Sequence, residues 1–153
     1  MPGGKRKTIA KCLVIAILIL DQLTKYFVSQ NIPLGKSIPI IKDIFHLTHV
    51  LNRGAAFGIF KDQIYFFIIT AIVAITLILI NLHRSRTLRI EIALSLILSG
   101  ALGNLIDRVR LEAVIDFLDF RIWPVFNIAD TAITIGGVLL AYSMLFKKTE
   151  KSV

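Results

Sequence analysis

Long apolar runs dominate the pattern of hydrophobic and polar positions along this chain of 153 residues. A helix needs about 20 mainly apolar residues to cross the hydrocarbon core of a bilayer. Four stretches approach or exceed that length, and they cover residues 9–28, 64–82, 90–108 and 125–146. The pattern therefore predicts a membrane protein of the all-α class with four transmembrane helices. Too little length remains for a separate soluble domain, so residues 1–153 are expected to form one membrane domain.

The long connection between the first two predicted helices has a different pattern. Residues 32–61 contain short β-branched and aromatic stretches that are bounded by Pro33, Gly35 and Pro39. Such stretches are typical of strands separated by turns. We expect a small β-sheet here, lying at the membrane surface.

The first apolar run resembles a secretory signal peptide in one respect, because basic residues precede it. However, the run continues into Asp21 and Lys25, where a signal peptide would have a small-residue cleavage site. We therefore expect a retained transmembrane helix.

Charge adds an orientation to this picture. The chain is 56% hydrophobic and has a formal net charge of +8, with 18 basic and 10 acidic residues. The N-terminal flank, the connection between the second and third spans and the C-terminal tail together hold ten basic and two acidic residues, which accounts for the whole excess. Basic flanks stay on the cytoplasmic side, so we predict an N-in/C-in topology. A basic excess of this kind is a topology signal, and nucleic acid is not an expected partner.

Polar residues within or beside apolar spans are expensive and mark candidate functional sites. With the predicted topology, they all lie in one layer near the outer leaflet. Asp21 and Lys25 have the i, i+4 spacing of an ion pair, and we expect a second structural pair between Asp107 and Arg108. Small residues such as Gly100 and Gly103 predict close packing of the third span. The other members of the polar layer are Asn52, Arg53, Asn104, Asn127 and Asp130.

Asp116, Asp119 and Asp130 have no adjacent basic residue in the sequence. Two carboxylates in one largely apolar site cannot both ionise easily, so one retains a proton more strongly than the other. Such a pair can activate water against an amide. From the residues alone, an aspartyl hydrolase and an ion-coupled membrane carrier both remain open.

His46 and His49 have H-x-x-H spacing but no further obvious ligands nearby, so we predict no metal site. Cys12 is the only cysteine and cannot form a disulfide within the chain. We expect it to act as a small apolar residue near the cytoplasmic end.

Five sequence blocks carry a more specific signal. In chain order they are DQLTK (Asp21 to Lys25), NRGAAFG (Asn52 to Gly58), GALGNLIDR (Gly100 to Arg108), VIDF (Val114 to Phe117) and FNIADTAI (Phe126 to Ile133). In this order and over nearly the whole chain, they resemble the motifs of the bacterial lipoprotein signal peptidases, the signal peptidase II family.

The resemblance implies an aspartyl endopeptidase of the bacterial inner membrane, with its active site near the extracytoplasmic face. Its expected substrate is a prolipoprotein whose cysteine carries a diacylglyceryl group, cleaved on the N-terminal side of that cysteine. The implied fold is a four-helix membrane domain with a small extracytoplasmic β-cradle. The implied enzyme works without metal or organic cofactor, contacts membrane lipid and is the target of globomycin. We expect a monomer.

The resemblance also assigns roles by motif position. It places the catalytic pair on Asp116 and Asp130 and gives Asp119 no catalytic role. The supporting polar and small residues are Asp21, Lys25, Asn52, Gly54, Asn104, Asp107, Arg108, Asn127 and Ala129.

Overall fold

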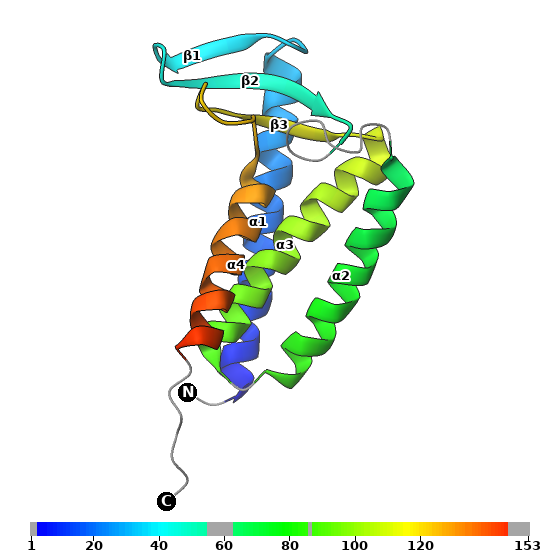
Figure 1. Ribbon diagram of the computed structural model, residues 1–153, viewed down its shortest axis with the longest axis vertical. Coiled ribbons are helices and arrows are strands. Elements are labelled where there is room, and N and C mark those ends of the chain that lie inside the picture. The colour runs from blue at the N-terminus through cyan, green and yellow to red at the C-terminus, as the bar shows by residue number, and fades with distance from the viewer. Residues whose placement is uncertain (1–2, 55–62, 86, 147–153) are drawn as a thin grey trace, which may run out of the picture.

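The computed structural model describes residues 3–54, 63–85 and 87–146. Within them, four helices form a bundle and a three-stranded sheet covers one end of it (Figure 1). The helices are α1 (Gly3–Asn31), α2 (Ile64–Arg84), α3 (Leu88–Leu111) and α4 (Ile128–Leu145). The strands are β1 (Ser37–Ile41), β2 (Phe45–Asn52) and β3 (Val114–Asp119).

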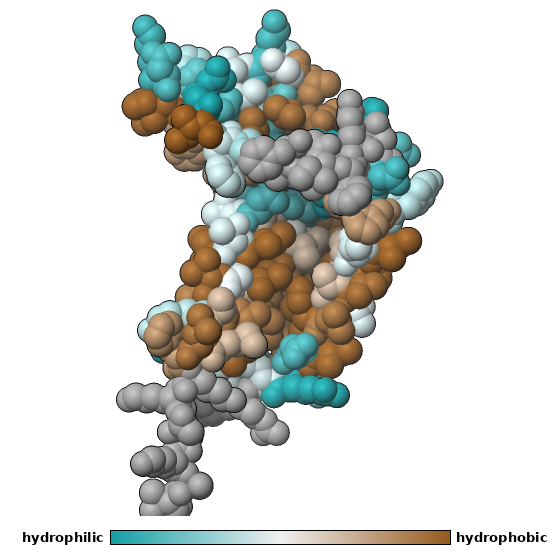
Figure 2. All heavy atoms as spheres, in the orientation of Figure 1, coloured by the Kyte–Doolittle hydropathy of each residue, from teal (hydrophilic) through white to brown (hydrophobic). Residues whose placement is uncertain are grey.

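All four helices are long and apolar enough to cross a membrane, as the sequence predicted. Figure 2 shows hydrophobic residues along the bundle, with hydrophilic residues gathered towards its two ends. The helix α1 begins six residues before the predicted span and continues three residues beyond it. The helix α4 begins at Ile128 instead of residue 125, because Asn127 caps it. The N-in/C-in orientation stays a prediction.

The sheet is antiparallel and has the order β1-β2-β3. Strands β1 and β2 come from the connection predicted to be a sheet, while residues 55–61 of that prediction lie outside the described residues. The third strand, β3, comes from the connection between α3 and α4, for which no strand was predicted. Its apolar residues Ile115 and Phe117 pack on Val28 of α1 and on Ile32, which directly follows that helix. This packing fixes the sheet to the end of the bundle.

The helix α3 lies centrally and packs against α1, α2 and α4. Two glycines allow the closest approaches. A Cβ atom on Gly100 would collide with the carbonyl oxygen of Ala129 in α4, and one on Gly103 would collide with the carboxylate of Asp21 in α1. Gly100 therefore lets the backbones of α3 and α4 approach closely, as predicted for this span, and Gly103 makes room for the Asp21 side chain.

Candidate active site

Two aspartates from different elements face one cavity between the sheet and the bundle. Asp116 lies on β3 and is buried, while Asp130 lies in the first turn of α4 and is half-buried. Both line a cavity of about 350 Å³. The rest of its lining is Asn52, Gly54, Phe67, Asn104, Arg108, Val114, Trp123, Pro124, Val125, Phe126, Ile133 and Thr134. The cavity thus has both polar and apolar walls.

Asn127 connects the two aspartates. Its Nδ2 group donates a hydrogen bond of 2.7 Å to Oδ1 of Asp116. Its Oδ1 atom accepts a bond of 2.9 Å from the backbone N–H of Asp130, and its own backbone N–H donates to Oδ2 of Asp130 at 3.3 Å. This is a capping box, which satisfies N–H groups at the start of a helix. The same local motif that begins α4 therefore orients both carboxylates.

The second oxygen of Asp116 is held from the sheet. Strand β2 pairs with β3 so that Asn52 lies diagonally across from Asp116. The Nδ2 group of Asn52 donates to Oδ2 of Asp116 at 3.0 Å, and its Oδ1 accepts from the backbone N–H of Gly54 at 2.9 Å. Burial, together with the negative charge of Asp130, raises the pKa of Asp116 to about 7, although the bonds from Asn52 and Asn127 oppose the rise.

A buried ion cluster lies behind this pair. The Nζ atom of Lys25 is 2.9 Å from Oδ2 of Asp21 and 3.0 Å from Oδ2 of Asp107. The predicted pair between Asp21 and Lys25 is therefore confirmed. The predicted pair between Asp107 and Arg108 is wrong, because Asp107 points to Lys25 on α1. Lys25 also donates to Oδ1 of Asn104 at 3.0 Å, which links the cluster to the cavity.

The cluster also holds neighbouring backbone. Oδ1 of Asp21 accepts a hydrogen bond of 2.9 Å from the backbone N–H of Ala129, in the first turn of α4. Oδ2 of Asp107 accepts a bond of 3.1 Å from the backbone N–H of Ile115, on β3 next to Asp116. The first N–H groups of a helix have no partner within the helix, so Asp21 supplies one. Ala129 thus takes part through its backbone and not through its side chain.

Gln22 belongs to the same cluster, although the sequence reasoning missed it. Its Nε2 atom lies 3.1 Å from Oδ2 of Asp21, 3.1 Å from Oδ1 of Asp107 and 3.3 Å from the carbonyl oxygen of Gly103. A polar amide next to Asp21 within an apolar span was the available signal. Gln22 therefore joins α1 to α3 at the level of the ion cluster.

Arg108 lies on the cavity wall, with its guanidinium 5.0 Å from the centre of the Phe67 ring on α2. Its NH1 group also approaches the carbonyl oxygen of Asn104 at 3.5 Å. A cation stacked on an aromatic face is held in place without a carboxylate partner. Arg108 thus presents positive charge to the cavity that holds both aspartates.

Asp119 lies elsewhere, two residues beyond Phe117 on β3. It accepts hydrogen bonds from Oγ1 of Thr48 at 2.7 Å and from the backbone N–H of Arg121 at 2.8 Å. The guanidinium of Arg121 pairs with it at 3.1 Å. These contacts tie the end of β3 to β2 and to the following turn, and Asp119 does not line the cavity of Asp116 and Asp130.

The two histidines of the H-x-x-H pattern bind neighbouring protein atoms. The Nδ1 atom of His46 lies 3.0 Å from Oγ of Ser37, and Nδ1 of His49 lies 2.7 Å from the carbonyl oxygen of Ile32. Among the residues that the structure describes, no three His, Cys, Asp or Glu side chains cluster as metal ligands.

The chain matches the family model described as signal peptidase (SPase) II over residues 13–146. The chain belongs to the signal peptidase II family. The membership confirms the resemblance carried by the five sequence blocks. Because the signal peptidase II family consists of peptidases, a peptidase is favoured over an ion-coupled carrier.

Relatives within the signal peptidase II family cover most of this chain. The lipoprotein signal peptidase of Halothermothrix orenii is 50% identical over 129 residues, which is 84% of this chain and 89% of that protein. The lipoprotein signal peptidase of Brevibacillus brevis is 51% identical over 135 residues, covering 84% of this chain and 90% of that protein.

A solved structure confirms the fold. A bacterial membrane enzyme determined by the in meso method at 2.3 Å resolution superposes with a TM-score of 0.88 and 34% sequence identity. The match covers 95% of this chain and 94% of that one. The arrangement of four helices and a small sheet is therefore shared with this bacterial membrane enzyme.

Proposed function

We propose that this protein is an intramembrane aspartyl endopeptidase that removes the signal peptide from diacylglyceryl-modified prolipoproteins. Cleavage occurs on the N-terminal side of the lipidated cysteine, and Asp116 and Asp130 are the catalytic pair. One observation carries the proposal: both carboxylates line the same cavity and are oriented by the same residue, Asn127. The membership in a peptidase family supports it.

The proposed reaction uses the pair with one proton between the two carboxyl groups. The ionised carboxylate takes a proton from water while the water oxygen attacks the scissile carbonyl carbon. The protonated carboxyl donates to the carbonyl oxygen, so that a tetrahedral diol forms. Collapse of the diol breaks the C–N bond, and a proton passes to the departing amine of the cysteine. A pKa of about 7 allows Asp116 to hold the shared proton near neutral pH.

The supporting residues keep this pair in position. Asn52 and Asn127 fix the two oxygens of Asp116, and Asn104 fixes Oδ1 of Asp130. The cluster around Lys25 anchors Asn104 and the start of α4. Preorganised dipoles of this kind lower the reorganisation needed in the transition state. These residues therefore act as positioning groups in the proposed mechanism.

The apolar part of the site suits a lipid-linked substrate. A second cavity of about 310 Å³ adjoins Asp130 and shares Trp123, Phe126 and Thr134 with the first. We assign it to apolar groups of the substrate next to the scissile bond. With the predicted N-in/C-in topology, both cavities lie near the extracytoplasmic face of the bacterial inner membrane, at the depth of a lipid anchor in the outer leaflet.

A gel-shift assay with purified protein and a lipidated prolipoprotein tests the proposal. The wild-type protein is expected to shorten the lipidated substrate and to leave the unlipidated form intact, and globomycin is expected to block the reaction. The variants Asp116→Asn and Asp130→Asn should lose all cleavage. Asp119→Asn is the matched control and should retain it. Wild-type cleavage by either of the first two variants would overturn the catalytic assignment.

A further inference from the structure

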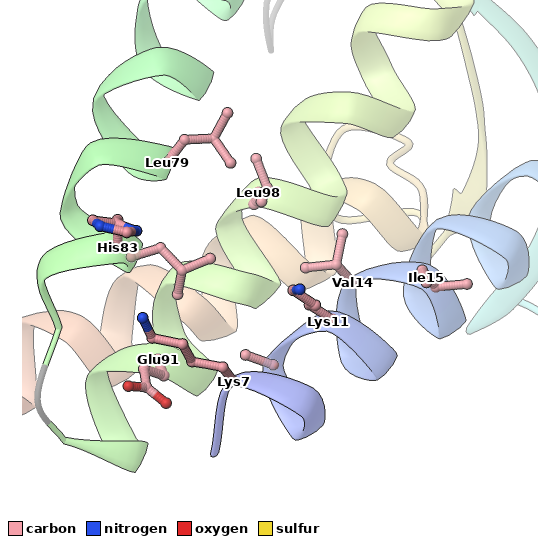
Figure 3. Close-up of a pocket in the computed structure, with 10 residues that line it drawn as sticks. Lys7, Lys11, Val14, Ile15, Leu79, His83, Glu91 and Leu98 are labelled. Atoms are coloured by element: carbon pink, nitrogen blue, oxygen red, sulfur yellow. The ribbon is translucent and has the colours of Figure 1, made fainter. Parts of the chain in front are cut away.

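Another cavity, separate from the two beside Asp130, lies at the end of the bundle opposite the sheet. There, α1, α2 and α3 surround a cavity of about 390 Å³ (Figure 3). The helices α1 and α2 each pack against α3 but barely contact one another. The apolar part of the lining is Ala10, Val14, Ile15, Leu79, Leu82 and Leu98. Inside a bilayer, an opening of this kind is accessible to an acyl chain.

The cavity has a basic rim. Lys7 and Lys11 are spaced i, i+4 on one face of α1, and His83 lies in the last turn of α2. In Figure 3 the Lys7 side chain extends from α1 towards α2. Among the described residues, neither lysine forms an ion pair with an acid. Two cations therefore stand at the mouth of an apolar cavity without a protein counter-ion in that part of the chain.

One acid also lines the cavity, and its charge is offset. Glu91 of α3 is only 1% exposed, and the Nε atom of Arg6 lies 4.0 Å from its Oε1. Neither carboxylate oxygen of Glu91 accepts a hydrogen bond within the described residues. The charge of Arg6 offsets that of Glu91, so the charges of Lys7 and Lys11 remain to attract an anion.

We propose that this cavity binds an anionic glycerophospholipid, with one acyl chain between α1 and α2 and the phosphate at Lys7 and Lys11. An amphiphile with a single anionic end matches an apolar cavity that has cations on one side only. Basic pockets between transmembrane helices bind anionic headgroups by the same combination of forces. The site lies at the other end of the bundle from Asp116 and Asp130, so it is independent of the proposed peptidase reaction.

Native mass spectrometry of the purified protein in detergent tests this site. We expect a phosphatidylglycerol molecule to bind more tightly than a phosphatidylcholine molecule with the same acyl chains. The double variant Lys7→Gln/Lys11→Gln should weaken phosphatidylglycerol binding roughly tenfold or more, because each cation near the headgroup contributes separately. Water-soluble glycerol phosphate should fail to displace the lipid, because it has no chain to enter the cavity.

The matched control is Lys5→Gln/Arg84→Gln. It removes two cations from the same end of the bundle, and neither residue lines the cavity. Its affinity for phosphatidylglycerol should stay within about twofold of wild type, because only local charges are expected to matter. Equal affinity for the two lipids, an unchanged affinity in the Lys7→Gln/Lys11→Gln variant, or an equal loss in the control would each overturn the proposal.

Discussion

The Nδ2 group of Asn104 donates a hydrogen bond of 2.8 Å to Oδ1 of Asp130. The orientation of this amide is determined from its other end, because Oδ1 of Asn104 accepts from Nζ of Lys25 at 3.0 Å and from Nδ2 of Asn127 at 3.1 Å. A flipped amide would lose all three bonds. Asn104 therefore connects the buried ion cluster to the proposed catalytic pair.

Replacing Asn104 with Asp tests this connection. The substitution keeps an acceptor for Lys25 but places a second carboxylate oxygen against Asp130. Loss of one preorganised donor in an active site lowers kcat by roughly 100-fold or more, and we expect a drop of that order with little change in KM. Initial rates in the gel-shift assay measure it.

Asn81→Asp is the matched control for this change. Asn81 is exposed on α2, and its side-chain amide donates to the carbonyl oxygen of Leu77 within the same helix. The Asn81→Asp variant should keep the wild-type kcat. Similar losses in the two variants would mean that Asn104 has no special link to catalysis.

The ion cluster shows how far spacing on one helix can predict contacts. Asp21 and Lys25 lie one turn apart, so their pairing follows from the sequence. Asp107 and Arg108 are adjacent, and adjacent residues point about 100° apart around a helix, so they do not face each other. The true partner of Asp107 is Lys25, which lies on another helix. Only the packing of α1 on α3 brings the two together.

The sheet shows a second limit on what can be predicted from the sequence. The stretch Val114–Asp119 is short, and its apolar residues do not alternate regularly with its two aspartates, so its pattern does not distinguish a strand from the end of a helix. Its pairing with β2 is a long-range contact, and its register decides which side chains share a face. The sequence blocks identified Asn52 and Asp116 as site residues, but did not pair them with each other. Their hydrogen bond depends on the register, which the sequence does not reveal.

Lys25→Met is expected to destabilise the fold strongly. The substitution retains an apolar stem of similar length but leaves the carboxylates of Asp21 and Asp107 buried without their cation. Breaking a buried ion pair from one side lowers the free energy of unfolding by about 3–5 kcal/mol. Thermal unfolding in detergent should show a large fall in Tm. The exposed Lys36→Met should leave Tm nearly unchanged, and equal Tm values for both variants would contradict the role of the cluster.

Gly100→Ala should weaken the contact between α3 and α4. A methyl group at Gly100 collides with the carbonyl oxygen of Ala129 and would lie 2.7 Å from Cγ1 of Ile133. The start of α4 must then move, and with it Asp130, so both Tm and cleavage rate should fall.

Gly137→Ala is the control for Gly100→Ala on the partner helix. A Cβ atom there meets nothing within 4 Å. Alanine is favoured over glycine inside a helix by about 1 kcal/mol, so Tm should hold or rise slightly. A loss of Tm at Gly137 as large as that at Gly100 would show that helix contact is not the cause.

The pH dependence of cleavage tests the assignment of the shared proton. The pKa of Asp116 is raised from its ordinary value of 3.8 to about 7, so the protonated form persists to neutral pH and is lost above it. If Asp116 holds the proton that polarises the carbonyl, kcat/KM should fall as pH rises above about 7, because kcat/KM reports ionisation of the free enzyme.

Asn52→Leu removes a hydrogen bond that opposes the rise in the pKa of Asp116. It should therefore move the falling limb to higher pH, whatever its effect on the maximal rate. Asp119→Asn should leave the limb in place, and a limb that stays fixed in Asn52→Leu would assign the proton to a group other than Asp116.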